Sequence, residues 1–444
     1  MGDENKRSRR RFKTWHVIAG LVLFLLALSH TTGSYKLRKR LQALHDQGYP
    51  ITIEELDRSY TIPEGAANAA DIYLSAFANF SEWDKADMNA LRKAQSPART
   101  ESLDASDRQL VEKFLSDNQK ALSLLHEAAA IEHCRYPIDF ARPPDTDAPW
   151  LDNMRQCSRL LYLDALIHCE NQDTEKALAS IRANTALARS MNAPLLTHWI
   201  TRMGLQSLVY RSIERVLNRL PLSDAQLLTL SGRLEEPGIK EGFKRNLIAE
   251  QCIGLHTLQA PIREVANRRY GKGMFLMLVP WKTLGLCYRD TLGYIDLMQD
   301  SIETLDLPDP ERLTAFVAVQ DSVRGSGGML TRMIWPSLAR LLDINFWHLA
   351  RARAMQTAFA LERYRLAEDH LPPSLDVLVP TYINAIPDDP FNAKPLKYRL
   401  RQPGYVVYSV GDDLTDESGT ERGTQGKDSR GKSLPYDLTF IVER

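Results

Sequence analysis

Two His-Cys dipeptides in the middle of the chain contain residue types that bind zinc. They are His133-Cys134 and His168-Cys169, with Glu132 and Glu170 beside them. Neighbouring residues on a helix point about 100° apart, so one dipeptide rarely supplies two ligands to one ion. The sequence also has no H-E-x-x-H, C-x-x-C or G-x-S-x-G motif. We therefore predict no metal centre and no catalytic constellation here.

An enzyme would then need a site assembled from scattered residues of the predicted helices. The first candidates are histidines and glutamates: His168, Glu170, His198 and Glu250. This is the alternative hypothesis for function, and it requires that two or more of these side chains share a pocket.

The five cysteines allow two interpretations. They are Cys134, Cys157, Cys169, Cys252 and Cys287. In an oxidising compartment one or two disulfides could form, and Cys134 with Cys157 or Cys169 is the best pair. Buried free thiols are the alternative.

The other candidate binding site is an acidic loop near the C-terminus. Residues 396–400 and 405–410 are separated by Gln402-Pro403-Gly404, a pattern that predicts a β-hairpin. The second strand runs into Gly411-Asp-Asp-Leu-Thr-Asp-Glu417. Calcium prefers several hard oxygen ligands, and this loop supplies many carboxylates. The alternative is a solvated acidic loop that continues through several glycines without an ion.

The order of elements from residue 362 onward resembles the C-terminal module of the major pseudopilin of type II secretion systems. The matching segments cover about the last 85 residues, under a fifth of the chain. They are Tyr364-Arg365-Leu366 at the end of a helix, Leu371-Pro372 with Leu375 and Leu378, the turn Pro387-Asp388-Asp389-Pro390-Phe391, the strand from Tyr405 to Asp413, and the late pair Asp437-Leu438.

This resemblance implies a structural calcium ion in the acidic loop. The ligands that it implies are Asp413 and Asp437, with Asp416 and the Val410 carbonyl as further candidates. The chain departs from the family pattern at Leu414, where the family has glycine, and in the length of the loop. The family's N-terminal processing signal is also absent, which argues against a fibre subunit.

The N-terminus carries a basic tail, residues 1–14, followed by an unbroken apolar run, residues 17–28. One interpretation is a cleaved signal peptide. The other is a signal anchor over residues 15–35, which is long enough to cross a bilayer and is bracketed by Trp15 and Tyr35. We favour the anchor, because a helix is expected to continue beyond it. The positive-inside rule then leaves the tail in the cytoplasm and the rest in the periplasm.

The predicted fold class is mainly α. An N-terminal transmembrane helix precedes an irregular bundle or solenoid of helical hairpins, and a long helix then carries a small antiparallel β-sheet module (α+β). The apolar run at residues 273–281 is predicted as core, with an interfacial or partner-binding patch as the alternative. Capping boxes are predicted at Thr52, Ser106 and Ser223. The predicted segments are 1–14 (tail), 15–35 (anchor), 36–327 (helical domain), 328–370 (spine helix) and 371–444 (β module).

Charge and location set the expected partners. The formal net charge is zero, which gives no support to nucleic-acid binding. The anchor predicts a single-pass protein of the bacterial inner membrane with a periplasmic C-terminal domain. We expect a scaffold or interaction protein with partners in the envelope, with secretion machinery among the candidates, and calcium as its one expected cofactor.

Overall fold

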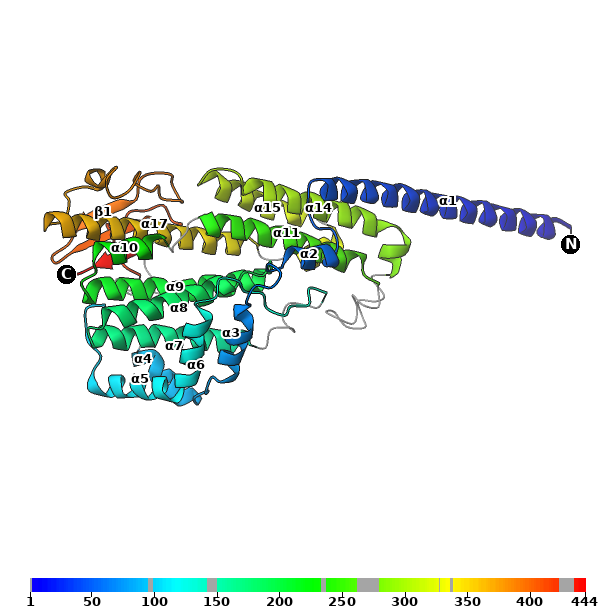
Figure 1. The fold of residues 1–444 in the computed structure, drawn as a ribbon. Coiled ribbons are helices and arrows are strands. Elements are labelled where there is room, and N and C mark those ends of the chain that lie inside the picture. The colour runs from blue at the N-terminus through cyan, green and yellow to red at the C-terminus, as the bar shows by residue number, and fades with distance from the viewer. Residues whose placement is uncertain are drawn as a thin grey trace. The chain divides into compact units, whose positions relative to one another are not determined.

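The computed structural model describes residues 2–94, 99–141, 150–232, 237–261, 279–326, 328–335, 338–422 and 435–444. This part of the chain is mainly helical and carries a small antiparallel sheet of three strands near the C-terminus, as predicted (Figure 1). It divides into two compact units. The first unit is Met1–Ser59, Leu247–Thr304 and Phe316–Ser337, and the second is Tyr60–Asn246, Leu305–Ala315 and Leu338–Arg444.

The first unit is organised around the packing of α1 (Gly2–Asp46) on α14 (Leu286–Thr304). Gly33 permits the close approach, because a Cβ there would lie only 2.9 Å from the Tyr288 side chain. The His30 ring donates to the Thr283 carbonyl over 2.9 Å. The other helices that the structure describes in this unit are α2 (Ile53–Ser59) and α16 (Met329–Ile334), and α11 (Pro237–Gln259) and α15 (Glu311–Ser326) are divided between the units.

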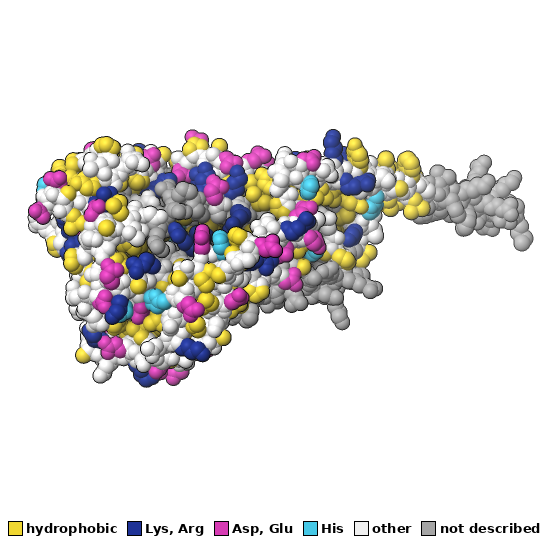
Figure 2. All heavy atoms as spheres, viewed as in Figure 1, with side chains coloured by type: hydrophobic (Ala, Val, Ile, Leu, Met, Phe, Trp, Pro, Cys, Tyr) yellow, Lys and Arg dark blue, Asp and Glu magenta, His cyan; other side chains and the backbone are white. Residues whose placement is uncertain are grey.

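The predicted anchor lies on α1. Five consecutive side chains, from Leu21 to Leu25, are between 48% and 67% exposed, and Leu28 is 51% exposed. Figure 2 shows hydrophobic side chains along this stretch. In the part of the chain that the structure describes, no helix reaches the length and apolarity of a membrane span. The side chains of residues 2–19, including the basic tail, lie outside that part.

A buried carboxylate ties α14 to α16. Asp290 is 3% exposed and accepts hydrogen bonds from the backbone amides of Leu330 and Thr331, at 2.8 and 3.1 Å, and from the Trp281 indole. Gly328 makes room, since a Cβ there would lie 2.0 Å from the carboxylate. Of the apolar run at residues 273–281, residues 273–278 lie outside the described chain, and of the other three Trp281 is buried whereas Pro280 is exposed.

The second unit contains helical hairpins in which consecutive helices pack on one another. Its described helices before α11 are α3 (Ala69–Ala78), α4 (Lys85–Ala94), α5 (Ala105–Asp117), α6 (Gln119–Ala128), α7 (Leu151–Glu170), α8 (Thr174–Ser190), α9 (Leu196–Arg219) and α10 (Asp224–Gly232). Among them α7, α8 and α9 pack on one another, with small and apolar side chains buried between them.

One of the three predicted capping boxes is confirmed in full, because Ser223 and Gln226 exchange reciprocal hydrogen bonds. At Thr52 only half of the box forms: the hydroxyl accepts from the amide of Glu55, but the Glu55 carboxylate accepts from the amide of Ile51 and not of Thr52. The box at Ser106 is wrong. Asp104 caps α5 instead, by accepting from the amide of Asp107 at 2.7 Å. A carboxylate at the N-cap also favours the positive end of the helix, so it competes well with a hydroxyl two residues later.

The C-terminal elements are α17 (Leu338–Glu368), the short 3₁₀ helix η2 (Leu375–Leu378) and the strands β1 (Lys397–Leu400), β2 (Tyr405–Ser409) and β3 (Leu438–Val442). Of these, α17, η2, β1 and β2 form close to where the sequence predicts them, and β3 is an additional strand. The strand order is β1-β2-β3, all antiparallel. The central strand β2 is fully buried and packs on α17, where the Tyr405 hydroxyl donates to Glu362 over 2.9 Å.

The edge of β3 is covered by polar side chains of α9. Glu214 accepts from the amide of Ile441 at 2.8 Å, and Asn218 bonds the Ile441 carbonyl and the Glu443 amide. An uncovered edge strand would present unpaired backbone groups to other chains. The opposite edge, β1, is therefore the more accessible side of the sheet, and its Leu400 is 50% exposed.

All five cysteines are buried and unpaired. The disulfide between Cys134 and Cys157 or Cys169 is therefore not formed, and the alternative of free buried thiols is the one observed. Burial raises the pKa of the Cys157 thiol to about 12, so this thiol is poorly nucleophilic.

Candidate functional site

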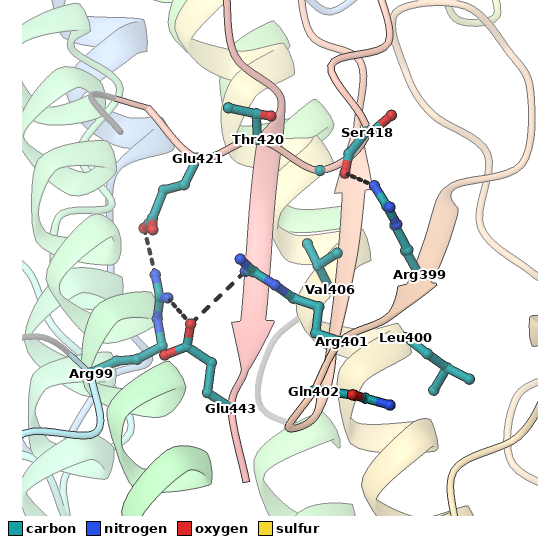
Figure 3. Close-up of a pocket in the computed structure, with 11 residues that line it drawn as sticks. Arg99, Arg399, Leu400, Arg401, Gln402, Val406, Ser418, Thr420, Glu421 and Glu443 are labelled. Carbon is teal, nitrogen blue, oxygen red and sulfur yellow. Dashed lines mark hydrogen bonds and ion pairs between the residues drawn. The ribbon is translucent and has the colours of Figure 1, made fainter. Parts of the chain in front are cut away.

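A polar pocket of about 550 Å³ opens beside β1 in the second unit (Figure 3). Its walls come from the hairpin end at residues 399–402, the loop at residues 418–421, and two residues distant in sequence, Arg99 and Glu443. Three arginines, Arg99, Arg399 and Arg401, thus meet at one cavity. Guanidinium groups bind carboxylates and phosphates bidentately, so this arrangement is suited to an anionic group.

Arg99 is the structural centre of the pocket. Its guanidinium lies 2.5 Å from Glu421, 3.2 Å from Glu443 and 3.8 Å from Glu214. Burial acts to lower the pKa of Arg99, but these carboxylates outweigh it and raise the pKa above its usual value. Burial also raises the pKa of Glu214. Arg99 therefore holds the loop, the C-terminal strand and α9 together, and its charge is balanced within the protein.

Arg399 and Arg401 are less constrained. Arg399 donates to the Ser418 carbonyl at 3.3 Å, and Arg401 lies 3.9 Å from Glu443. Each guanidinium has five N–H donors, and these contacts use only some of them. Both side chains are exposed. They are the two groups of the pocket that could bind a ligand without dismantling the fold.

Asp437 shapes the loop wall of this pocket. It is 1% exposed, and its Oδ2 accepts from the amides of Gly419 and Thr420, at 2.7 and 3.3 Å. Gly419 has a φ of +76°, and a Cβ there would lie 2.8 Å from Val406, so this position requires glycine. Burial raises the pKa of Asp437 to about 6. Its Oδ1 has no hydrogen-bond partner among the described residues.

The predicted calcium ligands do not form one cluster. Asp416 lies 2.5 Å from the Lys397 ammonium and accepts from the Tyr408 hydroxyl, while the exposed Asp413 accepts from the amide of Thr415. In the described residues, no group of three His, Cys, Asp or Glu side chains is arranged to hold a metal ion. Of the carboxylates implied by the resemblance, Asp416 thus has a cationic partner, whereas Oδ1 of Asp437 has no hydrogen-bond partner among the described residues.

A neighbouring carboxylate, Glu417, was not identified from the sequence as a candidate ligand. The Oε2 atom of Glu417 is buried and, like Oδ1 of Asp437, has no partner among the described residues. The charge of Glu417 contributes to the raised pKa of Asp437, so the two carboxylates interact. The dense acidic loop was a usable signal for Glu417, but its burial was not visible in the sequence.

The turn at Pro387–Phe391 has a structural role. Asp389 is buried and accepts from the amide of Phe391 at 3.0 Å, the Ser409 hydroxyl at 2.9 Å and the Val410 amide at 2.8 Å. This carboxylate joins the turn to the end of β2, immediately before the acidic loop. Its three bonds explain why an aspartate occupies that turn position.

The four residues proposed for an enzyme site have separate surroundings. His168 lies 3.5 Å from Asp164, whereas Glu170, two residues later, pairs with Arg215 and Arg219 at 3.3 and 3.4 Å. His198 is buried against Trp150, and burial lowers its pKa to about 4. Glu250 belongs to the first unit. Glu170 acts as the partner of two arginines, and these contacts give the enzyme hypothesis no support.

The arginine pocket was missed by sequence reasoning, although part of its signal is local. Arg399 and Arg401 are two residues apart at the end of a predicted strand, and side chains at that spacing share a face. Arg99, Glu421 and Glu443 offered no such hint.

Comparison of this chain with protein-family models, with curated proteins and with solved structures found no match.

Proposed function

We propose that this chain is a single-pass interaction protein of the bacterial inner membrane, anchored by residues 15–35 and with its two units in the periplasm. The observation that carries this proposal is the run of exposed apolar side chains from Leu21 to Leu25. Five consecutive helical residues point in all directions around the axis. A helix at the surface of a protein in water buries its apolar side chains on one face. A helix in the hydrocarbon core of a membrane can expose apolar side chains on every face.

Membrane retention tests the anchor. Membranes washed with alkaline carbonate should keep the full chain, and a protease added to spheroplasts should reach the two units. Leu23→Glu/Phe24→Glu should release the chain, because a charge at the centre of a span costs about 2.5–3.5 kcal/mol. The matched control is Leu366→Glu/Val377→Glu, which changes two exposed apolar residues elsewhere. Release of the wild-type chain would overturn the proposal.

The interaction role rests on the arginine pocket. Arg399 and Arg401 keep free donors beside an exposed Leu400 at the accessible edge of the sheet. This combination suits an acidic side chain or a chain terminus of a protein partner, with the apolar group adding contact area. Because the module resembles a pseudopilin, secretion machinery of the envelope is the first partner to examine.

A defined peptide tests this pocket. An acetylated hexaglutamate peptide should bind the full chain more tightly than its hexaglutamine counterpart. Arg399→Gln/Arg401→Gln should weaken that binding at least tenfold, and Arg38→Gln/Lys39→Gln, two exposed cations of α1, should not. A photo-crosslinking residue at position 400 should then capture a partner in cells that one at position 366 does not. Equal binding by both variants would contradict the proposal.

Structural calcium remains a narrower proposal for the acidic loop. Its support is the buried Oδ1 of Asp437, which has no hydrogen-bond partner in the part of the chain that the structure describes. A ligand that binds only the folded state raises stability by mass action, about 2.7 kcal/mol at a hundredfold excess over Kd. Calcium should raise the unfolding temperature of the wild-type chain and of Asp416→Asn, but not of Asp437→Asn. No calcium effect on the wild-type chain would leave the loop as a solvated acidic loop.

A further inference from the structure

A second pocket, of about 880 Å³, lies within the first unit between α1, α14 and α16. Glycines line this pocket and leave room for it. They are Gly33 of α1, Gly285 just before α14, Gly293 within α14 and Gly328 just before α16. Gly285 has a φ of +71°, and a Cβ there would approach the Ser29 hydroxyl to 3.0 Å. The cavity therefore lies at the contact between α1 and the rest of this unit.

The pocket carries an excess of positive charge. Lys36, Arg289 and Arg332 line it and are exposed. No ion pair or hydrogen bond joins the side chain of Lys36 or Arg289 to another described residue, and Arg332 uses only its Nε, toward the Gly328 carbonyl at 3.4 Å.

The two carboxylates of the pocket do not neutralise these cations. Asp290 is occupied by the amides at the start of α16 and by the Trp281 indole. Asp296 pairs with Arg40 over 3.0 Å. Three cations therefore face a cavity whose acidic groups already have partners, which is the condition for binding an anion.

The position of the pocket along α1 indicates where that anion would be. Residues 29–36 follow directly on the exposed apolar stretch that ends at Leu28. Leu284 and Leu286 are 46% and 47% exposed, and hydrogen bonds from Ser29 to the Leu284 carbonyl and from His30 to the Thr283 carbonyl hold this apolar corner against α1. Cations, polar side chains and exposed leucines thus gather at the end of the anchor, the level of lipid headgroups.

We propose that this pocket binds the headgroup of an anionic phospholipid, with Lys36, Arg289 and Arg332 around the phosphate and Leu284 and Leu286 against the acyl chains. The proposal rests on the membrane anchor proposed above. Binding a headgroup beside α1 fixes the unit at the membrane surface, in addition to the insertion of the helix itself.

The test measures lipid binding by the full chain in neutral detergent, using native mass spectrometry. Phosphatidylglycerol should bind at least tenfold more tightly than phosphatidylcholine. Each cation near an anionic lipid surface contributes roughly a fivefold change in affinity, so Lys36→Gln/Arg289→Gln should weaken phosphatidylglycerol binding about 25-fold. The matched control Arg38→Gln/Lys39→Gln removes two exposed cations that do not line the pocket and should change affinity less than threefold.

Three outcomes would overturn the proposal. One is equal loss in both double variants, which would show general electrostatic attraction. Another is no preference for phosphatidylglycerol in the wild-type chain. The third is full competition by glycerol phosphate at the same concentration, which would indicate a free phosphate ligand. Circular dichroism checks that the variants are folded. Failure of the anchor itself would appear separately, as release of the wild-type chain by carbonate.

Discussion

The helices α1 and α17 are both long and rich in apolar residues, but their surroundings are opposite. In α17 the consecutive residues Phe359, Ala360 and Leu361 are buried, so protein surrounds that helix. In α1 the consecutive residues from Leu21 to Leu25 are all exposed. A helix that is apolar all round needs a non-aqueous environment. For α17 that environment is the protein interior, and for α1 we propose that it is the membrane.

Polar residues sharpen the contrast. Within α17 Glu362 is 2% exposed, and it accepts hydrogen bonds from Tyr405 and Arg444, at 2.9 and 2.5 Å, and from Arg365. A buried charge without such partners would be costly. Beyond the exposed stretch of α1, in contrast, Lys36 is exposed and needs no protein partner.

The largest expected difference between the helices is in the cost of losing an aromatic ring. Phe346 on α17 is fully buried beside Phe391. Phe346→Ala should lower the free energy of unfolding by about 3–5 kcal/mol, because it leaves a cavity. Phe24→Ala on α1 should change it by less than about 0.5 kcal/mol in detergent. Chemical denaturation of the full chain measures both. Equal effects would mean that α1 is packed like α17.

The buried carboxylate of α17 gives the next largest effect. Glu362→Gln removes the charge that accepts from two arginines and should cost about 2–3 kcal/mol of unfolding free energy. The exposed Glu368 at the end of the same helix is the matched control, and Glu368→Gln should be nearly neutral. If the two variants unfold at the same denaturant concentration, the Glu362 contacts do not stabilise the fold.

Acid sensitivity provides a third test of burial along α17. Burial, with the charge of Arg351 adding to it, lowers the pKa of His348 to about 3. Between about pH 6.5 and pH 3 the unfolded chain therefore binds a proton that folded His348 does not, so stability is full above pH 6.5 and falls on acidification, by about 1.4 kcal/mol per pH unit. In His348→Gln this part of the pH dependence should vanish. Denaturation curves at pH 7, 5.5 and 4.5 measure it, and parallel pH profiles would contradict it.

The smallest effect concerns the part of α1 that does pack. The His30 ring bonds the Thr283 carbonyl and lies edge-on to Tyr288, with 5.5 Å between the ring centroids. His30→Ala should cost about 1 kcal/mol. Thr32→Ala, on the same turn, is the control and should be nearly neutral. Hydrogen exchange of α14 amides detects the difference, and no change would mean that this contact does not hold α1 in the unit.

The C-terminal module could be predicted because its signals are local. Pro372 and Pro373 end a helix, and Gln402-Pro403-Gly404 joins two alternating strands, so α17, η2, β1 and β2 appear close to their expected positions. Ser106 shows the limit of such reasoning, since the helix starts two residues earlier, where Asp104 accepts from the amide of Asp107.

The candidate site could be predicted only in part. Asp413, Asp416 and Asp437 were selected because carboxylates are dense in that loop, yet the structure gives them three different environments. Asp416 meets Lys397, Asp413 faces solvent, and Asp437 is buried under the loop. Which carboxylate keeps a free oxygen depends on neighbours that the loop sequence does not specify.

Amino-acid order alone determined the elements of this protein, since turn residues, caps and apolar periodicity act over a few positions. It determined the apolar character of α1 in the same way. Only the tertiary structure decided which charges meet. Arg99 reaches Glu443 across 344 positions, and Lys36 shares a pocket with Arg289 across more than 250. The charge of each side chain follows from its residue type. Whether it is balanced by an opposite charge depends on distances that exist only after the chain has folded.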